Sequence, residues 1–407
     1  MYARCARPLL KTCLLMNFLR SWAIAALIVP LAWGMAHAAD FYTPPALLRD
    51  AAHPGTLLRT ETMPGAPPGS TARRILYTSL DEQGEPVAVS GFVVVPDHPA
   101  PAGGRPVVAW AHPTSGVVTR CAPSLALTAF SSVPGLHDML ERGYVVVATD
   151  YPGLGTPGPH PYLVGGSEAR AVLDSVRAVH AISGANAGNR FAVWGHSQGG
   201  QAALFAGLIA RQYAPELELV GIAAAAPATD LVALLRDDFA TAGGRNLTAM
   251  TLWSWTRVYG LPIDQLVVPS AMPAVDALSG ECIESLWDVA MRLVSQRGLE
   301  HGFLTVPDLT RLVDWRRLLE ENSPGLLPPD VPLLLVQGDA DGLVRPEVTK
   351  AYGDRQCAAK VSMRLVILPG VNHGFAGRDG ARVAMAWIAQ RFDHFVPPDD
   401  CSLTAVR

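Results

Sequence analysis

The residues most able to do chemistry lie in Gly195-His196-Ser197-Gln198-Gly199, which fits the pattern G-x-S-x-G. The apolar run 191–194 precedes this pentapeptide, and an Ala- and Leu-rich stretch, residues 201–210, follows it. The first predicts a short buried strand and the second predicts a helix, so Ser197 would lie in a tight turn between them. In such a turn the hydroxyl is exposed above the sheet, and the flanking glycines leave room for the chain to fold back. The pattern therefore predicts that Ser197 is a nucleophile.

A serine hydroxyl is a weak nucleophile at neutral pH, so it needs a base that an acidic side chain holds in place. On a strand–turn–helix of this kind the order along the chain is serine, acid, histidine. His373 follows the apolar run 363–368, where a loop can bring it over Ser197. His301 lies in a helical interval instead, and His394 follows the last predicted helix. We therefore expect His373 to be the base.

Two aspartates compete for the role of the acid. Asp339 and Asp341 both lie in the turn after a predicted strand, residues 331–337. The pattern G-x-x-D-x-x-V favours Asp341, and Asp339 is expected to accept hydrogen bonds from backbone N–H groups of the turn. Asp150 also ends a predicted strand, but it precedes the serine, which favours a structural role for it.

A tetrahedral intermediate needs two N–H donors directed at its oxyanion. The backbone of Gln198, the residue after the nucleophile, is the first expected donor. The second should come from the loop after the predicted strand 107–111. Pro113 lacks an N–H, so Thr114 is the first useful donor after it, with Ser115 as a substitute.

Other reactive motifs are missing from the sequence. It contains no H-E-x-x-H, no close pair of cysteines, no P-loop and no dinucleotide-binding fingerprint, so no metal and no cofactor is expected. His112 and His196 neighbour the predicted donors and the nucleophile. We interpret both as supports of their loops.

Strands alternate with helices along most of the chain, and the strands are apolar throughout. This pattern predicts a mostly parallel sheet with helices on both faces. The expected strands are 73–79, 87–95, 107–111, 144–148, 191–194, 219–226, 331–337 and 363–368, and the expected helices are 136–142, 168–182, 201–210 and 377–391. Residues 40–70, rich in Pro and Gly, are expected to wrap the surface.

One interval, from Pro227 to Pro329, breaks this alternation, because it shows helical patterns and no strand. We interpret it as a helical cap inserted over the carboxyl ends of the strands. The helical patterns are 230–238, 284–297 and 308–320, and the expected domains are a core of 40–228 and 330–407 with a cap of 229–329. Four apolar residues of this interval either form the core of the cap or line a substrate site: Leu252, Trp253, Trp255 and Trp287.

Composition excludes some classes of partner. Of 407 residues, 49% are hydrophobic and 17% are charged, and the formal net charge is -4. Such a chain can bury a large core, and it has no basic excess with which to bind nucleic acid or acidic lipid.

The first 39 residues have the features of a signal peptide. Arg20 precedes the apolar run 22–33, and Ala36-His37-Ala38 fits a cleavage site. The run is too short for a comfortable membrane span. Translation can start at Met1 or at Met16, and in either case the mature chain is expected to be exported.

The motifs together resemble the secretory lipase family, which are α/β-hydrolases of yeasts and bacteria. The resemblance extends over roughly residues 43–401, and it implies hydrolysis of lipid or acylglycerol esters, a helical lid over an apolar acyl tunnel, and Ser197, Asp341 and His373 as the triad. One departure is Pro113, which stands where related sequences often have glycine. The motifs are Ala109-Trp-Ala-His-Pro-Thr-Ser-Gly116, Cys121-Ala-Pro-Ser124, Asp150-Tyr-Pro-Gly-Leu-Gly155, Pro161-Tyr-Leu163, residues 170–177, residues 195–200, the Asp341 turn and Asn372-His373.

Four cysteines remain after removal of a signal peptide that contains Cys5 and Cys13. An even number in an exported protein predicts disulfides, of which three pairings are possible; four free thiols are the alternative. Cys121–Cys282 and Cys357–Cys401 are the expected pairs. The expected cap would cover the face on which Cys121 lies, the tail that carries Cys401 packs near Cys357 in this fold, and fungal members of the resembled family have cysteines in similar places.

The sequence therefore predicts a secreted serine carboxylic-ester hydrolase of lipase type. Its partner would be a small-molecule ester or a lipid, with transient contact of the cap with a lipid surface and no nucleic acid. An acyltransferase with the same triad and an alcohol acceptor is the alternative. A non-catalytic binding protein on a hydrolase fold is a third hypothesis, against which all three triad positions carry competent residues. Acyl chain length and oligomeric state stay open.

Overall fold

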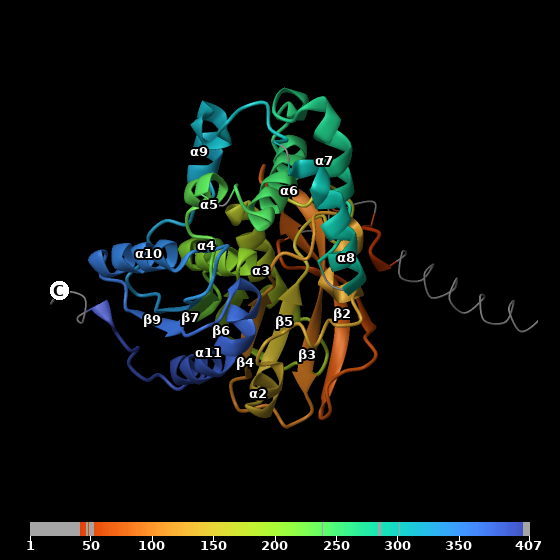
Figure 1. Ribbon diagram of the computed structural model, residues 1–407. Helices are drawn as coiled ribbons and strands as arrows, with labels where there is room; N and C mark the ends of the chain where they lie inside the picture. Colours follow the sequence, from red (N-terminus) through yellow and green to blue (C-terminus); the bar gives the residue numbers. More distant parts are fainter. Residues whose placement is uncertain are drawn as a thin grey trace, which may run out of the picture. The chain divides into compact units, whose positions relative to one another are not determined.

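The structure is a computed structural model that describes residues 41–45, 48, 53–237, 239–283, 286–300 and 302–401 (Figure 1). The chain divides into two compact units, Met1–Thr43 and Pro44–Arg407, and the second contains the elements described below. The expected signal peptide, residues 1–39, lies outside the described residues. Within the described ranges, no helix is long and apolar enough to cross a membrane.

Nine strands of the described chain form one sheet in the order β1-β2-β3-β5-β4-β6-β7-β8-β9. The first three are antiparallel to their neighbours, and the six from β4 to β9 run parallel. The mostly parallel sheet that the sequence predicts is thus confirmed. The strands are β1 Leu57–Thr62, β2 Ser70–Leu80, β3 Pro86–Pro96, β4 Arg105–Ala111, β5 Val145–Thr149, β6 Ala187–His196, β7 Glu218–Ala225, β8 Leu333–Gly338 and β9 Met363–Leu368.

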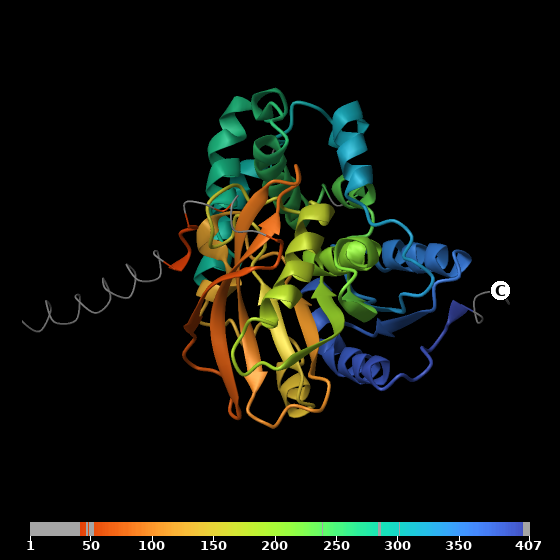
Figure 2. The same ribbon diagram turned by 180° about the vertical axis from the view of Figure 1, so that it is seen from behind.

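Helices cover both faces of this sheet, which explains why strands such as β5 and β8 are buried along their whole length. Residues of α3 and α4 belong to one hydrophobic core, with Tyr352 of α10, and residues of α2 and α11 belong to a second core on the other face. In the reverse view the yellow-green helices α3 and α4 lie in front of the strands (Figure 2). These helices are α2 Leu136–Glu141, α3 Gly165–Val179, α4 Gln198–Tyr213, α10 Pro346–Ala358 and α11 Ala376–Phe392.

Strand β1 and helix α10, which flank the parallel strands, are not predicted by the sequence. The stretch 40–70 was expected only to wrap the surface, but its residues 57–62 form β1 and pair antiparallel with β2 at the edge of the sheet. This strand carries few apolar residues, because an edge strand is only half-buried. Helix α10 starts with Pro346, whose fixed φ suits the first turn of a helix, and it has too weak an apolar stripe to be recognised from periodicity.

Between β7 and β8 the described residues form helices and no strand. The only β pairing among these described residues is an isolated bridge between Val267 and Leu304. We call residues 226–332 the β7–β8 segment; its helices lie together beyond one end of the sheet (Figure 1). The sequence patterns missed α6 and α7. The helices are α5 Leu231–Asp237, α6 Ala242–Val258, α7 Met272–Ser279, α8 Leu286–Ser295 and α9 Val313–Glu321.

The helices of this segment pack around a hydrophobic core that also includes Tyr162 and its neighbours in the loop before α3, and Trp255 is fully buried in it. The Trp255 ring stacks on that of Trp315 with centroids 5.6 Å apart, and its Nε1–H donates to the carbonyl of Tyr162. Trp253 is half-buried, with the Arg257 guanidinium 3.9 Å from its ring centroid. Of the two tryptophans, Trp255 therefore has the environment of a core residue. The side chain of Trp287 lies outside the described residues.

Asp150, which directly follows β5, connects strand β3 with the short helix that contains Ser124. Its carboxylate accepts hydrogen bonds from the Ser90 hydroxyl and from both the backbone N–H and the hydroxyl of Ser124. The carbonyl of Ser124 in turn accepts from the Arg74 guanidinium. Burial raises the pKa of Asp150 to about 6, although these hydrogen bonds oppose the rise. The contacts agree with the structural role that the sequence favours for this residue.

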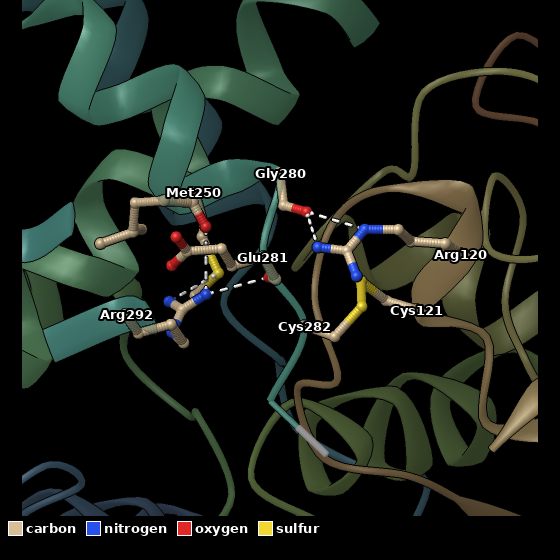
Figure 3. Close-up of a disulfide and its surroundings, with 8 residues drawn as sticks. Arg120, Cys121, Met250, Gly280, Glu281, Cys282 and Arg292 are labelled. Carbon is tan, nitrogen blue, oxygen red and sulfur yellow. Dashed lines mark hydrogen bonds between the residues drawn. A yellow bond between two sulfur atoms is a disulfide. The ribbon is translucent and has the colours of Figure 1, made fainter. Parts of the chain in front are cut away.

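Two disulfides join distant segments of the chain, and they are the expected pairs. Cys121–Cys282 joins the loop after β4 to the β7–β8 segment, and Cys357–Cys401 joins the end of α10 to the C-terminal tail. Beside the first disulfide the Arg120 guanidinium donates twice to the carbonyl of Gly280 (Figure 3).

Peptide mapping without reduction is expected to recover these two pairs and no other. Serine substitution of either pair should lower the free energy of unfolding, which denaturant titration measures. The pairs span 161 and 44 residues. In the chain-entropy model loops of these sizes correspond to upper values of about 5 and about 4 kcal/mol. A peptide that joins Cys121 to Cys357 or to Cys401, or four thiols that alkylate freely, would contradict the pairing.

Candidate active site

The backbone around Ser197 is a strained turn that only small neighbours permit. Ser197 lies between β6 and α4 with φ 58° and ψ -118°, a conformation that is rare for residues with a side chain. A Cβ on Gly195 would lie 2.1 Å from the carbonyl oxygen of Gly199, and one on Gly199 would lie 1.9 Å from that of Ala111. Both positions therefore require glycine, as the strand–turn–helix pattern predicts.

Three side chains from separate loops meet at this turn. His373, at the start of the short helix His373–Phe375 after β9, places its Nε2 2.8 Å from Ser197 Oγ. Its Nδ1 lies 2.8 Å from Asp341 Oδ2. A carboxylate only accepts, so Nδ1 carries the proton, and Nε2 is free to accept the hydroxyl proton of Ser197. The geometry is that of a serine–histidine–aspartate relay.

The carboxylate of Asp341 is held in its charged form. Its Oδ1 accepts the backbone N–H groups of Leu343 and Val344, each at 2.9 Å, and its Oδ2 also accepts from Gln337 Nε2 at 3.2 Å. Burial alone would raise the pKa of Asp341, but the hydrogen bonds from His373 and from the backbone outweigh it and lower the pKa. An ionised Asp341 can hold His373 in the Nδ1–H tautomer.

Asp339, the competing carboxylate, does not contact His373. It lies exposed in the same turn and accepts the backbone N–H of Gly370 at 2.6 Å. This is the contact of a residue that stabilises a turn.

His196 and His112 are buried beside these groups and support loops. His196 Nε2–H donates to the carbonyl of His373 at 2.9 Å, and burial, with the neighbouring His373 ring, lowers the pKa of His196 to about 3. His112 lies with its Nδ1 2.7 Å from the carbonyl oxygen of Pro113, and burial lowers its pKa to about 4. Both rings therefore stay neutral at pH 7.

The loop that carries Thr114 packs against the first turn of α4. A Cβ on Gly199 would lie within 2.6 Å of the carbonyl oxygens of both Ala111 and His112. The loop after β4 and the first turn of α4 are therefore in direct contact. Among the described residues, neither the backbone N–H of Thr114 nor that of Gln198 has an acceptor. Gln198 is also the first residue of α4, where the helix dipole favours negative charge. The start of α4 next to Ser197 is thus favourable for negative charge.

The side chain of Gln198 belongs to a buried polar cluster that the sequence does not predict. The side-chain amide of Gln198 lies 2.7 Å from Glu168 Oε1 and 3.0 Å from His160 Nε2, and all three side chains are buried. The only signal in the sequence was a carboxyl on an otherwise apolar helix face. In the described part of the chain, no group of three or more His, Cys, Asp and Glu residues could hold a metal ion.

Comparison with known proteins shows relatives among lipases. The secretory lipase family matches residues 130–398, which is more than half of the chain. Lipase 2 of Candida albicans is 27% identical over 90% of this chain and 83% of its own length, and lipase A of Arthroderma benhamiae is 25% identical over 90% and 81%. A shorter match, 30% identical over 47% of this chain and 45% of the relative, is to a probable inactive lipase of Mycobacterium tuberculosis.

Solved structures show the same fold. Candida antarctica lipase A in its closed state aligns with a TM-score of 0.71 at 20% identity over 88% of each chain. The rice cell wall degrading esterase LipA of Xanthomonas oryzae aligns with a TM-score of 0.69 at 19% identity over 84% of this chain and 99% of its own. Sheet, flanking helices and family match agree: the chain has the α/β-hydrolase fold and belongs to the secretory lipase family.

Proposed function

We propose that the protein is a secreted serine carboxylic-ester hydrolase of lipase type, with Ser197 as nucleophile, His373 as base and Asp341 as the acid that orients His373. The observation that carries this proposal is the pair of 2.8 Å hydrogen bonds by which the His373 imidazole links the Asp341 carboxylate to the Ser197 hydroxyl. Membership of the secretory lipase family supports the choice of an ester as substrate.

In the proposed reaction, Ser197 Oγ attacks the ester carbonyl carbon while its proton moves to His373 Nε2. The backbone N–H groups of Gln198 and Thr114 donate to the oxyanion that forms. The tetrahedral intermediate then collapses, His373 gives its proton to the departing alkoxide, and the alcohol leaves an acyl-enzyme. Water attacks the acyl-enzyme with His373 again as base, and the acid departs as Ser197 recovers its proton.

We assign the β7–β8 segment the role of a cap that lines an acyl site. It lies beyond one end of the sheet, and it is attached to the loop after Thr114 through Cys121–Cys282. Exposed apolar side chains at the end of α8, Leu293 and Val294, suit transient contact with a lipid surface. Disulfides and the family match support export of the mature chain.

The experiment that tests this proposal is a chain-length series of p-nitrophenyl esters with purified mature protein, run with and without an added alcohol. Release of free acid from long-chain esters supports a lipase. Predominant formation of a new ester would instead favour acyl transfer, and no turnover together with no labelling by a fluorophosphonate would favour a non-catalytic protein.

Replacement of Ser197 by alanine is expected to abolish turnover while the protein stays folded, because the hydroxyl contributes little packing. Loss of a triad member typically lowers kcat by about 10⁴-fold or more. The measurement is ester hydrolysis alongside the circular dichroism of the variant. Retention of more than a few per cent of activity would assign the nucleophile to another residue.

Asp341→Asn is expected to lower kcat by about 10⁴-fold, because an amide cannot hold His373 in the required tautomer. Asp339→Asn, in the same turn, is the matched control and should change kcat by only a few fold. Steady-state kinetics of both variants on one ester checks the ranking. The reverse order would assign the acid to Asp339.

The two tryptophans of α6 are expected to respond differently to alanine. Trp255→Ala should lower the free energy of unfolding by about 3–5 kcal/mol, the usual cost of removing a buried aromatic side chain. Trp253→Ala should instead alter the relative rates on short and long acyl chains while changing stability less. A uniform loss on every ester, acetate included, would show that Trp253 too belongs only to the core of the cap.

A further inference from the structure

Helix α3 carries a fully buried carboxyl, that of Glu168, directly behind the first turn of α4. Its Oε1 accepts the Gln198 side-chain N–H at 2.7 Å and the backbone N–H of Leu163 at 2.9 Å. Its Oε2 is also buried, and no described residue is its hydrogen-bond partner or forms an ion pair with it. A buried, unpaired carboxylate oxygen is costly, so this arrangement favours the protonated acid.

His160 fixes the orientation of the amide that Glu168 contacts. Its Nδ1 lies 2.9 Å from the carbonyl oxygen of Pro152, which can only accept, so Nδ1 carries the proton. Nε2 of His160 is then an acceptor and takes the second amide proton of Gln198 at 3.0 Å. Both protons of the Gln198 amide are therefore used, one toward Glu168 and one toward His160.

Gln198 is also the residue whose backbone N–H stands at the start of α4, next to Ser197. Its side chain is held from two sides, which leaves its backbone little freedom to rotate. Only the side chain of Gln198 would separate a negative charge on Glu168 from the developing oxyanion. Such a charge would repel the oxyanion and reduce the positive potential at the N-terminus of α4.

We propose that Glu168 is a positioning residue: in its neutral form it holds Gln198 together with His160, and its ionisation weakens the stabilisation of the oxyanion. This inference rests on the proposed hydrolase function, in which Gln198 supplies an oxyanion N–H. It predicts a decline of activity in alkaline solution that belongs to Glu168 and not to the triad.

The titratable groups that face Glu168 keep their charge state around neutral and mildly alkaline pH. Burial raises the pKa of Glu168 itself to about 8, against the hydrogen bonds from Gln198 and Leu163. Burial also raises the pKa of Tyr151, in the segment after β5, and that of Tyr162, in the loop before α3. It lowers the pKa of His160 to about 3. Among these groups only Glu168 changes charge near pH 8.

The test compares the pH profile of kcat for wild type and Glu168→Gln, with the released acid followed by titration and the uncatalysed rate subtracted. For wild type, kcat should fall by about tenfold above pH 8 with KM unchanged, less than the loss of a whole oxyanion donor would cause. Glu168→Gln keeps a neutral group of the same shape and should lack this fall. An identical fall in both proteins, or no fall in wild type, would overturn the proposal.

Asp174→Asn is the matched control, because Asp174 is a second buried carboxyl on α3. It contacts Ser79, Tyr213 and Arg177 and does not contact Gln198. Burial raises its pKa only to about 6. The alkaline fall should persist in this variant; its loss there would assign the effect to the helix and overturn the role of Glu168.

Thermal unfolding tests the charge state of Glu168 without turnover. Because its pKa is raised in the folded protein, wild type should lose more stability than Glu168→Gln as pH rises from the ordinary glutamate value toward about 8. The Tm of wild type minus that of Glu168→Gln should therefore fall from pH 5 to pH 8. A difference that does not change with pH would overturn the proposal.

Two further measurements separate the possible failures. If Glu168→Gln does not fold, the infrared carbonyl band of a protonated carboxyl in wild type should persist above pH 7 and disappear above pH 8; its loss by pH 6 would overturn the inference. Labelling of Ser197 by a fluorophosphonate reports on the hydrolase proposal alone. An unlabelled protein overturns that function, whereas a labelled, active protein with an unchanged pH profile overturns only the role of Glu168.

Discussion

The close approach of the loop after β4 to the first turn of α4 is the constraint on which the rest of the site depends. A single methyl group on Gly199 would overlap the carbonyl of Ala111, so the strand, the turn and the helix fit together only when this position is bare. In the parallel pairing of β4 with β6, Ala111 lies opposite Gly195. The loop after β4 and the turn that contains Ser197 therefore begin side by side at the same edge of the sheet. Ser197, which lies in the turn that this packing confines, has a strained backbone with φ 58°.

Three buried carboxyls near the carboxyl ends of the strands differ in pKa because their surroundings differ. Asp341 has the imidazole of His373 and two backbone N–H groups, so its pKa falls and it stays charged. Asp150 has hydroxyl and backbone donors, and its pKa rises to about 6. Glu168 has an amide and one backbone N–H, and its pKa rises to about 8. Burial raises the pKa of all three carboxyls; at Asp341 the hydrogen bonds and the charge of the neighbouring imidazole outweigh it, whereas at Asp150 and Glu168 the hydrogen bonds offset only part of it.

Parts of the structure were predictable because their signals are local. The turn at Ser197, the preference for Asp341 over Asp339 and the position of His373 after β9 all follow from a few consecutive residues and from the order of parallel strands. Other parts depend on contacts between distant segments. Strand β1 exists because β2 offers it an edge, and the cluster of Glu168, Gln198 and His160 forms only once α3, α4 and the loop before α3 are packed together. The spacing of residues along the chain does not predict such contacts between distant segments.

The attachment of the β7–β8 segment constrains how that segment can move. Besides Cys121–Cys282, the Arg120 guanidinium donates to the carbonyl of Gly280 (Figure 3). The backbone N–H of Ile283 also donates to the carbonyl of Ser115 at 2.8 Å. Ser115 directly follows Thr114, so residues 280–283 and the loop after β4 form one bonded unit. Any displacement of this end of the segment would therefore displace the backbone next to Thr114. If the segment acts as the proposed cap, movement that admits a substrate without disturbing that loop would involve other parts of the segment.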